Sequence, residues 1–291
     1  MANWPAAPEG FSVPLVSAEF VTAAPHAALA GEVIRYTWYA ERASAPVTFR
    51  ELPCTYVPVI IDLDAGWSIA DGRRPDRPPE RLGSFVAGLT DGPVIVSHGG
   101  SARCLQVDLA PLAARRLLGL PMSELANRSV SLEDVLGPPA SELAGRIADA
   151  PSPAERFALV ERALAARLAE APAADPGVAW SLGVLARSGG RAAIGALAGE
   201  LGWSHRRLIA RFRDAVGMPP KRVARILRFE RLTALIGADP AFGWARAAAE
   251  CGFADQAHLV REVRDLSGLT PTRLLADPSV NSVQDRAEDP A

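Results

Sequence analysis

The chain has 291 residues, of which 49% are hydrophobic and 22% are charged, as is typical of a soluble globular protein. This length is sufficient for two domains with sizeable cores. No basic segment followed by an apolar core opens the sequence, and no long uncharged apolar run occurs. We therefore expect neither a signal peptide nor a membrane span, and predict a cytoplasmic protein. The three cysteines lie far apart without a CxxC motif, which argues against a disulfide framework.

The formal net charge of −2 conceals an asymmetry along the chain. Residues 191–275 hold 14 basic and 8 acidic side chains, whereas residues 1–190 hold 16 basic and 21 acidic ones. The last segment, 276–291, holds 1 basic and 4 acidic side chains. A basic region beside an acidic one indicates that only the C-terminal part meets an anionic partner.

The first half of the chain is predicted to be rich in strands. Residues 1–30 contain much Pro and Ala and are expected to be irregular. From Gly31 onward, short segments rich in Val, Ile, Tyr and Thr are broken by Gly, Pro and Asp, and the polar stretch ADGRRPDRPPERLG is expected to form a loop. The predicted strands are EVIRYTWYA, VTFRELP, TYVPVIIDLD, VIVSHGG and RCLQVDLAP. Their close spacing predicts an antiparallel barrel or sandwich.

From about Leu109 the apolar spacing becomes helical. A short helix is expected over 111–118, ended by Gly119, and Ser131 is a candidate N-cap for the turn SLEDVLG. The segment 153–169 predicts an amphipathic helix. Beyond the linker APAADPG the chain is expected to be helical to about residue 275.

These patterns predict an α+β protein. The acidic C-terminal segment ADPSVNSVQDRAEDPA contains few apolar residues and is expected to be disordered. The predicted divisions are a strand-rich domain at 1–130, a helical connector and linker at 131–176, an all-α domain at 177–276 and the disordered tail at 277–291.

The C-terminal third contains an internal repeat, in which residues 194–220 align with residues 244–271. Two copies of one unit are a stronger signal than either copy alone. In each copy a short Ala-rich helix ends at a glycine, and a second helix follows, which is the helix-turn-helix pattern. The matched residues include Ala198 and Ala248, Gly202–Trp203 and Gly252–Phe253, Leu208 and Leu259, Arg213–Asp214 and Arg264–Asp265, and Gly217 and Gly268.

The second helix of each copy is predicted to bury one face and expose arginines on the other. Ser204 and Asp255 are the expected N-caps. The predicted buried faces consist of Leu208, Phe212 and Ala215 in the first copy, and of Leu259, Val263 and Leu266 in the second. A helix with this outward face fits the major groove, where Arg binds guanine edges or phosphates. The candidate DNA-binding residues are Ser204, His205, Arg206, Arg207, Ile209, Ala210, Arg213, Gln256, Ala257, His258, Arg261 and Arg264.

The segments LAGELGWSHRRLIARFRDAVGMPP and AAAECGFADQAHLVREVRDLSGLTPTRLL, joined by ARILRFERLTALI, resemble the DNA-binding domain of the AraC/XylS family of bacterial transcription regulators. This resemblance implies two helix-turn-helix motifs, with Arg206, Ile209 and Ala210 facing bases in the first. Gln256, Ala257, His258 and Arg261 would do so in the second. Where the family commonly has Gln and Arg, Ile209 and Ala210 are apolar, so the first helix is expected to contact thymine methyls or little sequence. Val263 replaces the family's usual Phe, which predicts looser packing in the second unit.

The stretch VDLAPLAARRLLGLPMSELANRSVSLEDVLG, with the strands before it, resembles the cupin-like sensor domain of some AraC-type regulators. The resemblance implies regulation by a small-molecule effector but does not identify one. Six aromatic residues could either line an effector pocket or form the core: Trp38, Tyr39, Phe49, Tyr56, Trp67 and Phe85.

Other chemistry has weaker support in the sequence. His26 and His98 are isolated, and His205 and His258 have no Cys/His cluster beside them, so no metal site or cofactor is predicted. The SHGGS stretch at 97–101 is interpreted as a β-turn because the GxSxG elbow of an esterase is missing. Cys54 and Cys104 could form a redox pair, but the sequence shows nothing that would lower the pKa of either thiol. Cys251 stands at an apolar core position of the repeat and is interpreted as a structural residue.

The favoured hypothesis is a sequence-specific transcription regulator and not an enzyme. Its partners are double-stranded promoter DNA, a small-molecule effector, and RNA polymerase if it is an activator. A homodimer is a further prediction that rests on 153–169, although this apolar stripe fits packing within one chain equally well. The alternatives are a ligand-independent architectural DNA-binding protein and an enzyme or repair protein that carries a DNA-binding module.

Overall fold

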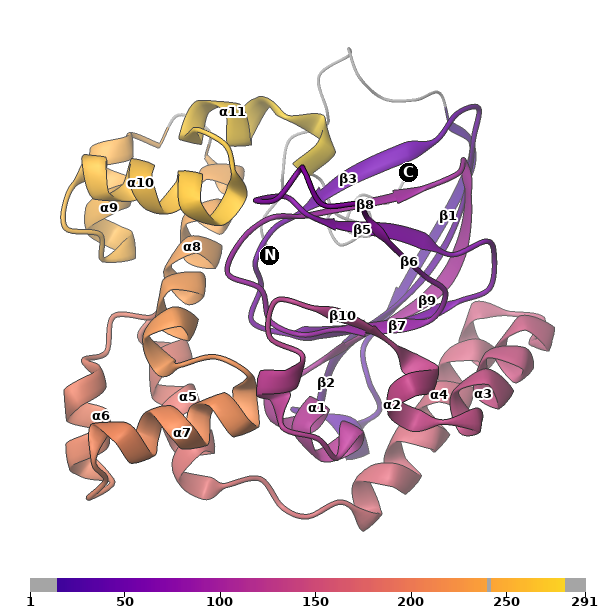
Figure 1. The fold of residues 1–291 in the computed structure, drawn as a ribbon, viewed down its shortest axis with the longest axis horizontal. Coiled ribbons are helices and arrows are strands. Elements are labelled where there is room, and N and C mark those ends of the chain that lie inside the picture. The colour runs from indigo at the N-terminus through magenta and orange to yellow at the C-terminus, as the bar shows by residue number, and fades with distance from the viewer. Residues whose placement is uncertain (1–14, 240–241, 281–291) are drawn as a thin grey trace.

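The computed structural model describes residues 15–239 and 242–280 (Figure 1). Two antiparallel sheets form a barrel, helices cover one of its sides, and an all-helical region lies beside it (Figure 1). The predicted α+β fold, with an antiparallel barrel followed by helices, is confirmed.

The larger sheet has six strands in the order β1-β2-β9-β4-β7-β10, and the smaller has four in the order β3-β8-β5-β6. All pairings between these strands are antiparallel. The six strands of the larger sheet are β1 (Leu15–Ala23), β2 (Val33–Ala43), β9 (Ser101–Leu109), β4 (Val57–Asp62), β7 (Phe85–Ala87) and β10 (Ser129–Ser131). The four of the smaller are β3 (Val47–Glu51), β8 (Val94–His98), β5 (Trp67–Asp71) and β6 (Glu80–Leu82).

The larger sheet is covered on both faces, by helices on one and by the smaller sheet on the other, and successive side chains of a strand point to opposite faces. In β4, Val59 and Ile61 belong to the core between the sheet and the helices, whereas Ile60 belongs to the core between the two sheets. In β2, Trp38 and Tyr39 divide in the same way. This double burial explains why these segments are nearly continuous runs of apolar residues.

The expectation that residues 1–30 are irregular is wrong for the part that the structure describes, because residues 15–23 form β1. This strand pairs with β2 in a register that places Phe20 opposite Tyr39, and the two rings lie 4.8 Å apart. Its residues LVSAEFVTA have strand-forming character, which the surrounding Pro and Ala obscure. An edge strand of this kind is stabilised by its neighbour rather than by its own sequence.

Four helices follow the barrel strands: α1 (Pro111–Leu118), α2 (Leu132–Leu136), α3 (Pro138–Asp149) and α4 (Pro153–Glu170). Gly119, with a φ of 71°, ends α1 as predicted. Ser131 precedes α2, but its side chain accepts no capping hydrogen bond. The apolar stripe of α4 packs within the chain, where Phe157 stacks on Tyr36 at 5.8 Å. The stripe therefore gives no support to the predicted homodimer.

The C-terminal region consists of α5 (Pro176–Arg187), α6 (Ile194–Glu200), α7 (His205–Val216), α8 (Pro220–Ala238), α9 (Trp244–Cys251), α10 (Gln256–Ser267) and α11 (Pro271–Ala276). Short 3-10 turns occur at Ala27–Leu29 (η1), Met122–Glu124 (η2) and Pro278–Val280 (η3). No helix among the described residues has the length and apolarity needed to cross a membrane.

The predicted disorder of the tail is wrong for residues 277–280. They form a turn that contacts β3, and Val280 is 4% exposed in the core of the last helices. This one buried apolar side chain anchors a segment whose composition is otherwise polar. The remainder of the predicted tail, 281–291, lies outside the described residues.

Candidate nucleic-acid interface and effector cavity

The two repeats fold into two helix-turn-helix units with the same local geometry. Unit one consists of α6 and α7 (residues 194–216), and unit two consists of α9 and α10 (residues 244–267). The turn glycines Gly202 and Gly252 have φ angles of 62° and 77°, a left-handed conformation that glycine adopts without strain. After each glycine the aromatic residue donates its backbone N–H to the first helix. Trp203 donates to the Ala198 carbonyl at 2.9 Å, and Phe253 donates to Ala248 at 2.8 Å.

Each second helix begins at the predicted N-cap. The Ser204 hydroxyl accepts the N–H of Arg207 at 3.2 Å, and the Asp255 carboxylate accepts the N–H of His258 at 2.6 Å. Both bonds satisfy a backbone donor that has no partner within the helix. The caps therefore fix where α7 and α10 start, and with that which side chains point outward.

The predicted buried faces are confirmed. Leu208, Phe212, Leu259, Val263 and Leu266 are fully buried, and Ala215 is 7% exposed. Ten of the twelve candidate DNA-binding residues are exposed to solvent: Ser204, His205, Arg206, Arg207, Ala210, Arg213, Gln256, Ala257, Arg261 and Arg264. The helical periodicity thus gives both helices an exposed arginine face opposite the core, as expected for two recognition helices.

Arg207 and His258 make side-chain contacts within their own units. The Arg207 guanidinium lies 4.8 Å from the centre of the Trp203 ring, and His258 accepts the N–H of Ala254 at 3.1 Å. The second nitrogen of His258 lies 3.5 Å from Glu262. These contacts hold both side chains against their own unit. Ser204 and His205 are exposed at the start of α7, and Ile209 is half-buried.

Helix α8 joins the two units and sets their separation. Its 19 residues span about 28 Å at 1.5 Å per residue, and the units lie at its two ends (Figure 1). Successive major-groove segments on one side of B-DNA are about 34 Å apart. The length of α8 is therefore of the order needed to present two recognition helices to one duplex.

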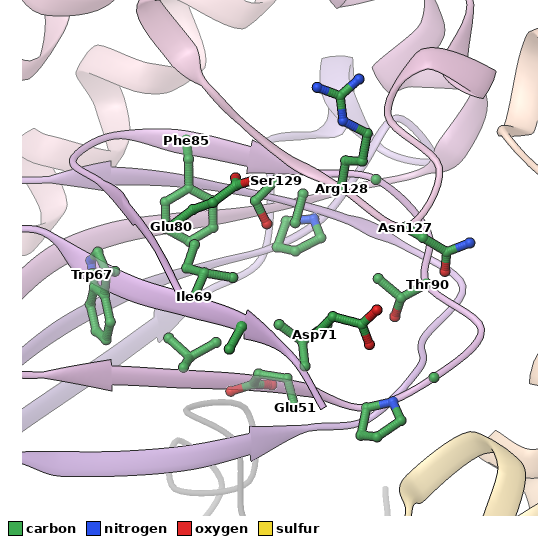
Figure 2. Close-up of a pocket in the computed structure, with 18 of the residues that line it drawn as sticks. Glu51, Trp67, Ile69, Asp71, Glu80, Phe85, Thr90, Asn127, Arg128 and Ser129 are labelled. Atoms are coloured by element: carbon green, nitrogen blue, oxygen red, sulfur yellow. The ribbon is translucent and has the colours of Figure 1, made fainter. Parts of the chain in front are cut away.

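The barrel contains a cavity of about 540 Å³ (Figure 2). Three of the six aromatic residues considered for a pocket, Phe49, Trp67 and Phe85, line this cavity. Trp38 and Tyr39 are instead 3% and 0% exposed within the two cores. Aliphatic residues complete the apolar wall. The polar lining is formed by Glu51, Asp71, Glu80, Thr90, Gln106, Asn127 and Ser129 together with four arginines, Arg73, Arg74, Arg77 and Arg128.

Burial raises the pKa of the Cys54 and Cys104 thiols, and nearby carboxylates raise it further. This is the opposite of the lowered pKa that a reactive thiolate needs. Cys251 is fully buried in unit two, and burial raises its pKa to about 11. These environments fit a structural role for Cys251 and give no support to a redox pair of Cys54 and Cys104.

The isolated histidines have structural partners. His26 accepts the N–H of Ala28 at the start of η1, and His98 lies buried 3.5 Å from Glu41. The SHGGS stretch forms the turn between β8 and β9, as predicted. Within the described part of the chain, no group of three His, Cys, Asp or Glu side chains is arranged to hold a metal ion.

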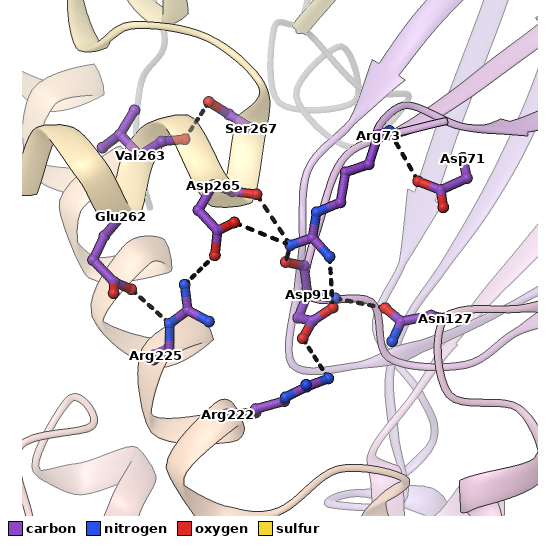
Figure 3. Close-up of polar contacts among 10 residues, drawn as sticks. All are labelled: Asp71, Arg73, Asp91, Asn127, Arg222, Arg225, Glu262, Val263, Asp265 and Ser267. Carbon is purple, nitrogen blue, oxygen red and sulfur yellow. Dashed lines mark hydrogen bonds and ion pairs between the residues drawn. The ribbon is translucent and has the colours of Figure 1, made fainter. Parts of the chain in front are cut away.

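A network of charged residues, which the sequence does not predict, connects the barrel to the C-terminal helices (Figure 3). This Arg73 network comprises Arg73, Asp91, Arg222, Arg225 and Asp265. Asp91 lies 3.0 Å from Arg73 and 2.7 Å from Arg222 of α8. Arg73 also donates to the Asp265 backbone carbonyl on α10 at 3.1 Å, and Arg225 pairs with the Asp265 carboxylate. No sequence spacing signals these contacts, because the partners come from distant segments.

Comparison with known proteins gives two family matches. Residues 197–277 match the model of a helix-turn-helix domain family, and residues 21–131 match DUF6597, a domain of unknown function. No curated protein matches the chain.

Several solved structures are similar at low identity. An apo ToxT variant from Vibrio cholerae strain SCE256 is 12% identical with a TM-score of 0.45, over 87% of this chain and 98% of that one. Wild-type ToxT of the same strain with unsaturated fatty acid bound is 10% identical with a TM-score of 0.45, over 81% and 96% of the two chains. The AraC-like transcriptional activator CuxR is 16% identical with a TM-score of 0.30, over 83% and 89%.

Two helix-turn-helix units on a shared helix, each with an exposed arginine face, define a DNA-binding transcription regulator. The order of the units, their connecting helix and the barrel before them are those that the resemblance to the AraC/XylS family implies. Residues 197–277 belong to a helix-turn-helix domain family.

Proposed function

We propose that α7 and α10 enter successive major-groove segments of promoter DNA and that a small molecule in the barrel cavity controls this binding. The observation that carries the DNA-binding part is the paired arrangement of exposed arginines. Arg206 and Arg213 lie opposite the buried stripe of α7, and Arg261 and Arg264 lie opposite that of α10. The net positive charge of residues 191–275 supports binding to phosphates.

The two helices have different roles in this proposal. Ile209 and Ala210 of α7 offer no hydrogen-bonding side chain, so α7 contributes mainly phosphate contacts through its arginines. On α10, Gln256 and Arg261 are exposed and carry groups that bind adenine and guanine edges. Most of the sequence preference therefore resides in unit two.

The cavity supports an effector with an apolar body and an anionic group. Its wall is aromatic and aliphatic, and its polar lining holds four arginines against three carboxylates, Glu51, Asp71 and Glu80. Apolar cavities of this size with a few polar groups at the rim are typical of small-molecule sites. Arg73, Arg74 and Arg77 lie on one loop, so an anionic group at this side would meet several guanidinium groups.

Footprinting on randomised and genomic DNA tests the DNA-binding part. We expect a protected site with two half-sites about one helical turn apart. Protection that is indifferent to sequence would support the architectural alternative instead. The proposal includes no catalytic role. If the regulator is an activator, RNA polymerase is a further partner, which transcription assays with the purified polymerase would test.

Thermal denaturation with a panel of small molecules tests the effector part. Ligands that combine an apolar body with a carboxylate are expected to raise the Tm, whereas their esters are not. Trp67→Ala, which removes part of the cavity wall, should abolish the shift. An unchanged shift in that variant would place the ligand outside the cavity.

A further inference from the structure

The two helix-turn-helix units are attached to the barrel by different kinds of contact. Unit one shares a continuous core with the barrel: Leu208, Phe212 and Val216 of α7 belong to the same apolar cluster as the strands and α1. The backbones also touch, since a Cβ at Gly217 would lie 2.9 Å from the Met122 carbonyl oxygen. Separating unit one from the barrel would expose this core to water, at a cost that grows with the apolar area.

Unit two has a core of its own. Leu259, Val263 and Leu266 of α10 belong to a separate cluster with the second half of α8, to which the barrel contributes the half-buried Leu52. The cluster also contains Val280 of η3, which lies beside β3. The apolar attachment of unit two to the barrel is therefore small.

The other attachments of unit two are polar. Arg73 donates to the Asp265 carbonyl at 3.1 Å, and Arg50 donates to the Ser267 carbonyl at 3.3 Å. The Arg73 and Asp265 side chains are 37% and 53% exposed, so water competes for this contact. Partly exposed charged contacts contribute little to stability, and this end of the interface can open without disrupting a core.

The division between the two cores falls within α8. Its residues up to Ile226 belong to the barrel cluster, and its residues from Phe229 onward belong to the cluster of unit two. A small bend between these two positions would move unit two while unit one stays on the barrel. Beside this position, Glu230 of α8 accepts the N–H of Thr55 at 2.7 Å and its hydroxyl at 2.8 Å.

Arg73 belongs to both the interface and the cavity. Its side chain lies against Gly92, another cavity residue, and a methyl group at that position would overlap the guanidinium. An anionic occupant that paired with Arg73 would compete for the donors that now bind Asp91 and Asp265. The Arg73 side chain therefore connects the cavity to the end of α10 without any intermediate residue (Figure 3).

We infer that unit two is the mobile unit of this regulator, that the Arg73 network holds it in the position for DNA binding, and that an occupant of the cavity acts on it through Arg73. The inference rests on the proposed function for its effect on DNA. We assign the DNA-binding position to the state in which the network is formed, because the outward faces of both recognition helices are exposed to solvent in that state. Arg73 is in this sense a positioning residue.

The native cysteines provide a test that needs neither DNA nor effector. Cys54 is half-buried next to Thr55, whereas Cys104 and Cys251 are 2% and 0% exposed inside the barrel and unit two. When unit two moves away with Glu230, Cys54 gains exposure and loses a neighbouring carboxylate that raises its pKa. Cys54 and Cys104 both line the cavity, but only Cys54 adjoins the contact between Thr55 and Glu230. Iodoacetamide labelling of the full chain is read by mass spectrometry at each cysteine, and faster labelling of Cys54 without faster labelling of Cys104 reports the opening.

Three pairs of variants make this test specific. Arg73→Ala, Gly92→Ala and Asp265→Asn remove or displace parts of the network. Each variant has a matched control. Arg74→Ala removes the arginine next to Arg73 in the cavity lining, and Gly99→Ala adds a Cβ that meets nothing within 4 Å. Glu250→Gln removes the same charge from unit two as Asp265→Asn, but among the described contacts Glu250 pairs only with Arg246.

We expect the three network variants to accelerate labelling of Cys54 about two- to fivefold, as loss of a partly exposed contact allows, with no change in the controls. Labelling of Cys104 and Cys251 should stay slow. Unchanged labelling of Cys54 would overturn the inference. So would equal acceleration at Cys104, because it would mean that the barrel itself has loosened.

DNA binding gives the second readout, on the full footprinted site and on a half-site that binds unit one. Arg73→Ala and Gly92→Ala should weaken binding to the full site about two- to fivefold and leave the half-site unchanged. Equal loss on both DNAs, or tighter binding to the full site, would overturn the positioning role. If the wild-type chain protects no specific site, the proposed function fails, while the labelling result still decides whether unit two moves.

Discussion

The two helix-turn-helix units have nearly the same local structure but different surroundings. Both use a left-handed glycine, an N-cap and a fully buried leucine in the second helix, Leu208 or Leu259. They differ in what surrounds them, because unit one completes the apolar core of the barrel and unit two has its own. A repeat in sequence thus fixes the local unit, while its attachment depends on side chains outside the repeat.

The outward faces also differ. Unit one presents Ile209 and Ala210 between its arginines, whereas unit two presents Gln256 and Arg261. The unit with more hydrogen-bonding groups for base edges is thus the one that is less firmly attached to the barrel. In the proposed arrangement, the mobile unit supplies the sequence preference and the fixed unit supplies an anchor on the phosphates.

Core substitutions should show the largest difference between the units. Phe212→Ala is expected to destabilise the chain by about 3–5 kcal/mol, and Leu259→Ala by about 2–5 kcal/mol. Because Phe212 belongs to the shared core, its loss should lower the melting temperature of the barrel as well. Loss of Leu259 should instead produce a separate, earlier transition for unit two.

Differential scanning calorimetry of the full chain measures both outcomes. Ile34→Ala, at a half-exposed position of β2, is the control and should change little. A single transition shifted equally by both core variants would contradict the division into two cores.

Base contacts should show the next largest effect. Arg261→Ala is expected to cost about 1–3 kcal/mol at one base pair and to relax the preference there. Arg206→Ala should weaken binding on all sequences and reduce the slope of affinity against salt. Arg211→Ala serves as the comparison within α7, because Arg211 pairs with Asp175 at 3.0 Å rather than facing the groove.

Binding assays on single-base variants of the site, repeated at several salt concentrations, separate these contributions. A uniform loss for Arg261→Ala would make it a phosphate contact. If neither arginine mattered, the assignment of the recognition helices would have to be abandoned.

The N-caps should show that the two units are locally equivalent. Ser204→Ala and Asp255→Ala each remove one capping bond and are expected to cost about 1 kcal/mol. Urea denaturation followed by circular dichroism measures the loss, with Ser204→Asp as a variant that keeps a cap. Unequal losses well beyond this range would show that the tertiary environment also governs the helix starts.

The smallest effect concerns the buried Glu230 beside Thr55. Burial raises the pKa of this carboxyl above its ordinary value of 4.5, although hydrogen bonds from Thr55 oppose the shift. Above pH 4.5 the folded chain therefore binds more protons than the unfolded chain, and stability falls as the pH rises toward the folded pKa. Glu230→Gln keeps an acceptor for Thr55 and should remove this fall.

We expect Glu230→Gln to raise the Tm at pH 7 by no more than about 4 °C. A stabilisation of about 1 kcal/mol raises the Tm of a chain of roughly this length by about 2–4 °C. The gain should disappear near pH 4. A gain that was the same at both pH values would show that ionisation of Glu230 is not its source.

Much of the candidate site was predictable because it depends on short-range patterns. The caps at Ser204 and Asp255 and the exposed arginines follow from residue spacing within single helices. The repeat follows from the direct comparison of residues 194–220 with residues 244–271. The fixed orientation of His258 was not predictable, since it depends on the N–H of Ala254 and on Glu262.

The strands and the ends of the chain were less predictable. Strand β1 was missed because an edge strand is defined by its partner, and the turn at Pro278–Val280 was missed because one buried valine outweighs a polar composition. Of the aromatic residues considered for a pocket, sequence alone could not separate Phe49 and Trp67, which line the cavity, from Tyr39, which fills a core.

The sequence by itself determined the class of protein, the two helix-turn-helix units and the face that each presents, because helical periodicity and capping act over one or two turns. Only the tertiary structure decided which arginines are free for DNA, which core each unit joins and how the cavity reaches α10. Those features depend on pairs such as Arg73 and Asp265, which are 192 residues apart in the sequence and come into contact only in the folded structure, where the barrel lies beside α10.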